Sequence, residues 1–174
     1  MSIAFLILLR FVHVMSSFCW AGGAVVNYLF VEPTARDLAP DGTKFVQHLV
    51  NKRKFSIFMA INSTLTVASG ALLLWQLTRG QFSAYIQTGP GLGFAVGSMV
   101  GIAVYLVGMF GIKPRAEQLG KIGAEVQAAG GPPSPEQAAR LQKLDREMSS
   151  FSRIDFWLVL LSLTLMATSR YFLF

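Results

Sequence analysis

A histidine lies inside a long apolar stretch near the start of the chain. The stretch from Ile3 to Phe30 carries Arg10 and His13 as its basic residues. An ionisable group within a membrane-spanning helix is costly, so it usually faces protein, water or a cofactor rather than lipid. The imidazole could hydrogen-bond to a neighbouring helix, ligate haem iron, or handle copper or protons. His13 is therefore the first candidate for chemistry.

Polar and small residues share one face of the predicted helix with His13. At about 100° per residue, that face holds Ser17, Trp20, Ala24 and Asn27, with Ser16 and Gly23 beside it and Arg10 at its edge. The second apolar stretch has a matching face, made of Asn62, Thr66, Ser69 and Gln76. Because unpaired polar groups are costly in hydrocarbon, we expect the two faces to meet. Such a contact would explain the polar residues of the second stretch without any ligand.

Haem b binding is the leading prediction for this face. His13 would be an axial ligand of the iron, the small residues would leave room for the macrocycle, and Trp20 would pack against it. A second ligand is harder to find, because His48 should lie at a different depth, whereas Met59 is a possible partner. The predicted metal ligand is His13, and the predicted cofactor-binding residues are His13, Ser17, Trp20, Gly23, Asn27, Met59, Asn62 and Thr66. No catalytic residue is identified.

A soft-metal alternative rests on Met15 and Cys19, which are four residues apart. Their sulfur atoms could hold Cu(I), but their face points away from His13. Cys19 is the single cysteine of the chain, which excludes an internal disulfide.

Composition indicates a membrane protein. Of the 174 residues, 53% are hydrophobic and 14% are charged, and the mean hydropathy is +0.50. Soluble domains usually carry about 25% charged residues. The 15 Lys and Arg against 9 Asp and Glu give a net charge of +6. These basic residues lie mostly in two loops rather than on a soluble face, so nucleic acid is not an expected partner.

Four membrane-spanning helices are predicted in a single domain, 1–174. They cover about Ile3–Val31, Phe55–Leu77, Gly91–Ile112 and Ile154–Phe172, each long enough to cross about 30 Å of hydrocarbon. Pro33 and Pro40 should close the first helix and bracket a short loop. Asp41 or Thr43 should cap a helix that runs on into the second span, and Gly89-Pro90-Gly91 should break the chain before the third.

The segment from Pro114 to Ser150 is polar and charged, with apolar residues at helical spacing. Gly130-Gly131-Pro132-Pro133 predicts a turn, and Ser134 with Gln137 predicts a capping box. We therefore expect an antiparallel helical hairpin between the third and fourth spans, either a solvated arm or a docking surface. The predicted fold is an all-α polytopic membrane protein, a four-transmembrane-helix bundle with this hairpin as a cytoplasmic extension.

Glycine spacing and end charges suggest further contacts. Gly93, Gly97 and Gly101 repeat every fourth residue, which favours close helix packing over a cofactor gap. Arg153 and Asp155 flank the start of the fourth span, where we interpret them as interfacial anchors or as an ion pair with the basic first loop; binding of an anionic group is the alternative.

Loop charges predict the orientation. Basic residues concentrate in loops 32–54 and 113–153, while the opposite side offers Arg79 and Arg170. By the positive-inside rule these two loops are cytoplasmic and both termini lie outside. We expect a multi-pass protein of a bacterial-type inner (plasma) membrane, in contact with the lipid bilayer, and its candidate protein partners are itself or other membrane subunits.

The pattern His13-x6-Trp20-x-Gly22-Gly23-x9-Pro33 resembles the first helix of CopD-like integral membrane proteins, which look like distant relatives of HemJ-type protoporphyrinogen oxidases. Residues 52–59, leading to Gly70, are similar to the start of the second HemJ helix. The resemblance covers mainly residues 9–75. It implies a compact helical bundle in which His13 matches a histidine linked to haem b. The chain lacks the Pro-Arg pair and further histidine of HemJ-type proteins, so porphyrinogen oxidation is not predicted.

Three functions follow from these observations. The first is a haem b protein with an electron-transfer or haem-linked redox role, for which a haem-dependent membrane oxidoreductase is one candidate. The second is a non-catalytic subunit of a larger membrane complex, for which the glycine-rich helix and the hairpin would be contact surfaces. The third is CopD-like copper transport.

Overall fold

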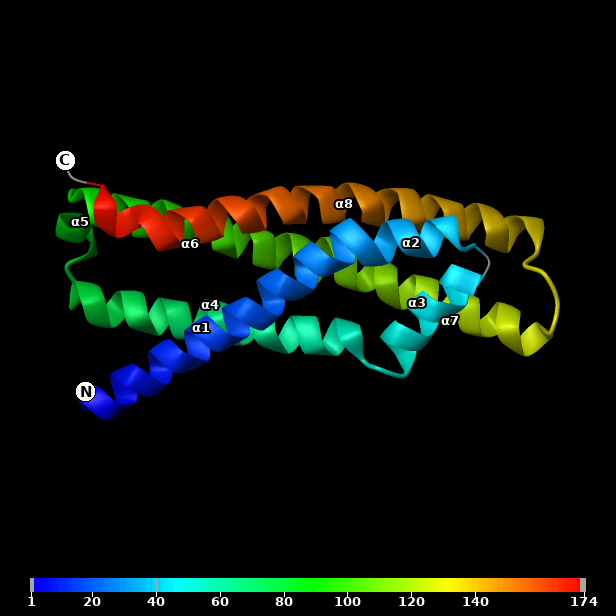
Figure 1. Ribbon diagram of the computed structural model, residues 1–174, viewed down its shortest axis with the longest axis horizontal. Coiled ribbons are helices and arrows are strands. Elements are labelled where there is room, and N and C mark those ends of the chain that lie inside the picture. The colour runs from blue at the N-terminus through cyan, green and yellow to red at the C-terminus, as the bar shows by residue number, and fades with distance from the viewer. Residues whose placement is uncertain (1, 40, 173–174) are drawn as a thin grey trace.

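The computed structural model describes residues 2–39 and 41–172, and these are helical with no strand among them (Figure 1). Four helical stretches are long and apolar enough to cross a membrane: Ile3–Asp37, Phe55–Thr78, Gly89–Ala129 and Pro135–Tyr171. The predicted all-α class with four such helices is confirmed.

The first stretch passes through a proline without ending. It consists of α1 (Ile3–Val26), a π-helical segment η1 (Asn27–Val31) and α2 (Glu32–Asp37). The prediction that Pro33 closes the first helix is therefore wrong. Proline lacks an N–H and clashes with the carbonyl four residues earlier in a regular α-helix. The wider turn of η1 lies where that conflict would occur. Pro40, the other predicted boundary, lies outside the described residues.

The third stretch repeats this arrangement. The short helix α5 (Phe82–Tyr85) precedes α6 (Gly89–Leu106), which continues through η2 (Val107–Ile112) into α7 (Lys113–Ala129). Pro114 directly follows η2, as Pro33 follows η1. The helix break that is predicted at Gly89-Pro90-Gly91 lies slightly earlier, between α5 and α6, and this segment forms the first turn of α6. The Thr88 hydroxyl accepts a hydrogen bond from the Gly91 N–H at 3.1 Å and so caps the helix.

A separate helix precedes the second span. Helix α3 (Asp41–Asn51) begins at Asp41 but does not run on into α4 (Phe55–Thr78), so that prediction is wrong. Lys54 has a φ of 57°, and one residue in this left-handed conformation interrupts a right-handed helix. The chain can therefore change direction between α3 and α4.

The last helix, α8 (Pro135–Thr168), is 34 residues long and is followed by η3 (Ser169–Tyr171). The predicted capping box is confirmed, because the Ser134 and Gln137 side chains each accept from the other residue's backbone N–H. Helix α8 is continuous from this cap, so it has no boundary near Ser150 between a hairpin arm and a membrane span. It packs along α7 and then along α6 (Figure 1).

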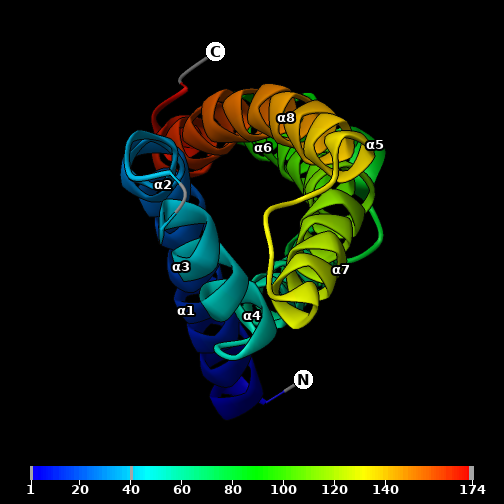
Figure 2. The same cartoon turned by 90° about the vertical axis from the view of Figure 1, so that its right-hand side faces the viewer.

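The helices pack as two pairs, α1 with α4 and α6 with α8, and the two pairs touch each other less (Figures 1 and 2). A small core of Trp20, Ala21, Ala24, Val104 and Val159 joins them. Within the second pair, a Cβ added at Gly97 would lie 3.2 Å from Leu165 Cβ. The Ser162 hydroxyl also donates to the Gly97 carbonyl at 3.0 Å. The predicted packing role of this glycine row is confirmed.

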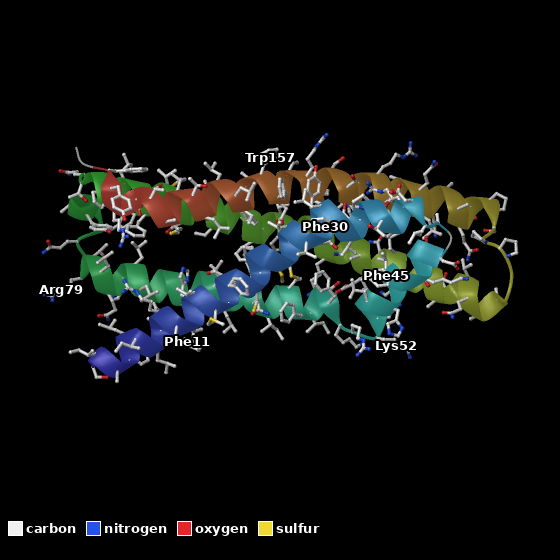
Figure 3. All side chains as sticks on the ribbon, viewed as in Figure 1. Phe11, Phe30, Phe45, Lys52, Arg79 and Trp157 are labelled. Atoms are coloured by element: carbon white, nitrogen blue, oxygen red, sulfur yellow. The ribbon has the colours of Figure 1, made fainter. Side chains whose placement is uncertain are left out.

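Large apolar side chains cover the outside of the molecule. Phe11, Phe30 and Trp157 point outward from α1, η1 and α8 and are 61%, 62% and 64% exposed (Figure 3). A soluble monomer rarely exposes so much contiguous apolar surface. These faces are suited to acyl chains, which agrees with a membrane-embedded protein.

Candidate functional site

His13 contacts helix α4 through its ring. The distance from His13 Nδ1 to the Thr66 carbonyl oxygen is 2.9 Å, and the distance to Ser69 Oγ is 3.3 Å. A carbonyl only accepts, so in this contact Nδ1 carries the proton. A Cβ added at Gly70 would lie 2.8 Å from His13 Cε1. The imidazole therefore packs against α4 at a point where glycine makes the approach possible.

Further hydrogen bonds complete this contact. Thr66 Oγ1 lies 2.9 Å from Ser16 Oγ, which in turn donates to the Val12 carbonyl at 2.7 Å. We call the set His13, Ser16, Thr66, Ser69 and Gly70 the His13 contact. The predicted meeting of the two polar faces is confirmed here.

Other predicted members of the polar faces bond within their own helices. The Ser17 hydroxyl donates to the His13 carbonyl at 2.5 Å, and the Asn62 amide donates to the Phe58 carbonyl at 2.8 Å. Such bonds to the preceding turn satisfy a polar side chain without any interhelical partner. These residues therefore do not join α1 to α4.

A cavity of about 420 Å³ lies elsewhere, toward the end of the molecule where α3 and α7 meet. Residues of α1, η1, α2, α3, α4, η2, α7 and α8 line it, and Figure 2 views the molecule from that end. The walls are mainly apolar and include Val31, Leu49, Phe55, Ile112, Leu119 and the methionines Met59, Met109 and Met148. The two π-helical segments both border this space.

The cavity takes in only part of the predicted cofactor site. Trp20, Asn27 and Met59 line it. Gly23 is not in the lining but packs against Met59, which is: a Cβ added at Gly23 would lie 2.7 Å from Met59 Sδ. The remaining predicted residues, which are His13, Ser17, Asn62 and Thr66, are not in its lining. A haem ligated by His13 would therefore not occupy this cavity.

Two buried acids face the cavity. Glu32 on α2 is 8% exposed and Asp155 on α8 is 5% exposed, and both line the cavity. Ser152, which is 4% exposed, lies beside Glu32, and its hydroxyl has no hydrogen-bond partner of ordinary geometry. Asp155 Oδ1 is likewise buried without a hydrogen-bond partner. We call Glu32, Ser152 and Asp155 the acid cluster.

The π-helical turn explains how Asn27 reaches Glu32. Residues five apart in an α-helix point about 140° away from each other, whereas the i→i+5 pattern of a π-helix brings them onto one face. The Glu32 N–H donates to the Asn27 carbonyl, and the Asn27 side-chain amide donates to Glu32 Oε1 at 2.8 Å. The segment before Pro33 thus fixes one member of the acid cluster.

A charged bridge lies beside the acid cluster. Arg36 Nη2 is 3.7 Å from Glu32 Oε2, and Arg36 Nε is 3.3 Å from Asp145 Oδ2 on α8. Arg36 is 43% exposed, so one guanidinium group at the solvent-facing side serves two carboxylates. In the part of the chain that the structure describes, Asp155 makes no ion pair. The predicted ion pair of Asp155 with the basic first loop is therefore wrong, and its role as an interfacial anchor stays a prediction.

The sequence does not predict the acid cluster. It places Glu32 in a loop, because Pro33 predicts the end of the helix, and it places Asp155 at the membrane interface. A usable signal was present, since acidic residues are few in this chain and each of these two adjoins an apolar helical run.

Comparison with known protein families, with curated proteins and with solved structures finds no match. The resemblance of residues 9–75 to CopD-like and HemJ-type proteins therefore stays a prediction. Among residues 2–39 and 41–172, no three His, Cys, Asp or Glu side chains gather as a metal-ligand group.

Proposed function

We propose that this protein is a membrane-embedded binding protein, and that its ligand is a small molecule with a large apolar part. The observation that carries the proposal is the cavity of about 420 Å³, whose walls are mainly apolar and which contains buried polar groups at one place. Ligand sites in proteins typically have volumes of about 300–1,000 Å³ and combine apolar walls with a few polar groups.

The side chains of the walls support this proposal. Met59, Met109 and Met148 come from three different helical stretches. Methionine is unbranched and polarisable, so it adapts to ligands of different shapes. The π-helical segments at the rim are a further support, because such segments are frequent at functional sites.

We further propose that the protein lies in a bacterial-type inner membrane with loops 32–54 and 113–153 on the cytoplasmic side. The basic residues of these loops support that orientation. The cavity would then open toward the cytoplasmic half of the membrane, where a ligand could arrive from the lipid or from the cytoplasm.

Tryptophan fluorescence tests the cavity directly. Trp20 lines the cavity, whereas Trp75 and Trp157 are 66% and 64% exposed on the outside. In a Trp75→Phe, Trp157→Phe background, Trp20 is the sole reporter. A neutral heavy-atom quencher, 1-bromo-4-neopentylbenzene, should then quench its emission saturably in detergent-purified protein.

A pair of variants on α7 separates cavity binding from partition into the micelle. Ala116 lines the cavity, while Ala124 is exposed on the same helix. Ala116→Phe should weaken saturable quenching at least about tenfold by filling space, whereas Ala124→Phe should leave it unchanged. Equal quenching in both variants would contradict the proposal.

Haem binding through His13 is the second candidate function. One observation favours it: Nδ1 is held by the Thr66 carbonyl, and metal-ligating histidines usually have their other ring nitrogen held in this way. The haem would lie outside the cavity described above. Purified protein supplemented with haem should show a Soret band that His13→Ala removes. Absence of the band in the unmodified chain would exclude this function.

The remaining hypotheses have separate readouts. A role as an accessory subunit predicts that a stable partner copurifies without a chromophore or metal. Copper transport predicts stoichiometric copper that is lost with Cys19 or His13.

A further inference from the structure

We infer, on the basis of the proposed binding function, that the ligand is an organic cation whose ammonium group lies at the acid cluster and whose apolar part lies along the methionine-lined wall. The inference names the class of ligand and the residues that would recognise its charge. It rests on the placement, burial and partners of Glu32, Ser152 and Asp155.

Charge balance around the cavity is the first argument. Three carboxyl groups line it, those of Glu32, Asp145 and Asp155, together with the cations of Arg36 and Lys113. Arg36 is shared between Glu32 and Asp145, and Lys113 lies 4.0 Å from Glu117, which is not in the lining. Asp155 has no such cation among the described residues. A bound cation would supply the missing charge.

Hydrogen bonding is the second argument. Asp155 Oδ1 is a buried acceptor without a partner, although buried polar groups are normally paired. Leaving a buried acceptor unpaired is costly, and more so for a charged group. A protonated amine has N–H donors but no acceptor, and therefore matches a site that holds an unpaired acceptor.

The remaining walls favour an organic ion over an inorganic one. Ca²⁺ and Mg²⁺ require about six or more oxygen ligands, and Mg²⁺ gives up its water reluctantly. Here the cavity that holds the acids is also lined by apolar side chains and by the aromatic rings of Trp20 and Phe55. Aromatic rings attract ammonium groups through their faces, most strongly when water is excluded.

The decisive experiment uses two probes that differ in one atom. (4-Bromobenzyl)trimethylammonium and 1-bromo-4-neopentylbenzene have the same shape, and nitrogen in the first replaces carbon in the second. Both carry the same heavy-atom quencher. Quenching of Trp20 is measured at pH 8 in neutral detergent, in the background that lacks Trp75 and Trp157.

Variants then remove the charge with little change of shape. Asp155→Asn and Glu32→Gln each delete one buried carboxylate, and Asp37→Asn is the matched control because Asp37 is exposed and outside the cavity lining. Asp155→Asn should weaken binding of the ammonium probe at least about tenfold. Binding of the neutral probe should stay unchanged or improve, which also shows that the variant is folded. Asp37→Asn should change neither.

The two proposals fail differently. If the neutral probe binds and the ammonium probe shows no dependence on Asp155 or Glu32, the cation inference is wrong and the binding function stands. That result would be expected if Glu32 and Asp155 were both protonated, because the acid cluster would then carry no negative charge. Displacement of the ammonium probe by millimolar Mg²⁺, with the neutral probe retained, would assign the acid cluster to an inorganic ion and overturn the inference. If neither probe quenches Trp20 saturably, both proposals fail.

Discussion

The His13 contact and the acid cluster place polar groups between helices in opposite ways. In the His13 contact, the side-chain polar atoms nearest the partner helix have hydrogen-bond partners. In the acid cluster, Asp155 Oδ1 has none, and Asp155 lines a cavity. Paired polar groups hold helices together, whereas unpaired buried ones indicate that something else completes the site. The acid cluster, rather than His13, is therefore the better candidate for ligand binding.

The largest expected effect tests the packing of the His13 contact. A Cβ at Gly70 would meet the imidazole, with 2.8 Å to Cε1, whereas a Cβ at Gly22 on α1 would meet nothing within 4 Å. We therefore expect Gly70→Ala to destabilise the protein by about 1–3 kcal/mol, as over-packing usually does. Gly22→Ala should be neutral or slightly stabilising, because alanine is the better helix former.

Reversible denaturation in mixed micelles measures both free energies of unfolding. A double variant, Gly70→Ala with His13→Ala, should recover part of the loss because the ring that clashes is gone. If the two glycine variants had the same stability, the imidazole would not pack against α4 in solution. The His13 contact would then not be the packed, hydrogen-bonded region that we compare with the acid cluster.

The next prediction compares removal of a polar group from each region. Thr66→Val deletes the hydrogen bond to Ser16, and such interhelical bonds contribute about 0.6 kcal/mol or somewhat more. Asp155→Leu instead deletes a buried carboxyl group whose Oδ1 has no partner, and replacing buried charged groups by apolar ones is often neutral or stabilising, by about 1 kcal/mol or more.

The two variants should therefore change the free energy of unfolding in opposite directions in the absence of ligand. The same denaturation assay measures the two changes, and Asp37→Asn supplies the baseline for an exposed acid. If Asp155→Leu destabilises the protein more than Thr66→Val does, Asp155 has a structural partner within the protein, and the acid cluster would no longer argue for a ligand.

The sequence predicted one of these regions much better than the other. The His13 contact follows from helical periodicity and from the cost of unpaired polar groups in lipid, because both faces lie inside regular helices. The acid cluster depends on η1, where a π-helical turn carries the helix through Pro33 and aligns Asn27 with Glu32. A prediction that assumes a regular α-helix, with about 100° between successive residues, cannot show that Asn27 and Glu32 lie on one face.

The same reasoning accounts for the errors at the helix ends. Pro33 predicts the end of a helix, because proline usually stops a helix unless the preceding turn widens. The break between α3 and α4 depends on a left-handed Lys54, a residue type that gives no warning of this conformation. The position of Asp155 depends on the continuity of α8, because the uninterrupted helix carries this residue to the cavity that α2 also lines and not to a loop.

The smallest expected effect concerns the charged bridge that adjoins the acid cluster. Arg36→Met removes the guanidinium group shared by Glu32 and Asp145 but keeps an apolar stem. Because Arg36 is partly exposed, we expect a loss of stability of less than about 1 kcal/mol that shrinks as salt is added. Lys44→Met is the control, since its ion pair with Asp41 lies within one exposed helical turn.

The same variant should strengthen binding of the ammonium probe. Without Arg36, Glu32 loses the cation that competes with the ligand, so the acid cluster becomes more negative while its carboxylates stay in place. Trp20 quenching should show tighter binding of (4-bromobenzyl)trimethylammonium and unchanged binding of its neutral counterpart. Weaker binding of the cation in Arg36→Met would mean that Arg36 organises the cavity rather than competing for its charge, because a purely electrostatic competitor cannot lower cation affinity when it is removed.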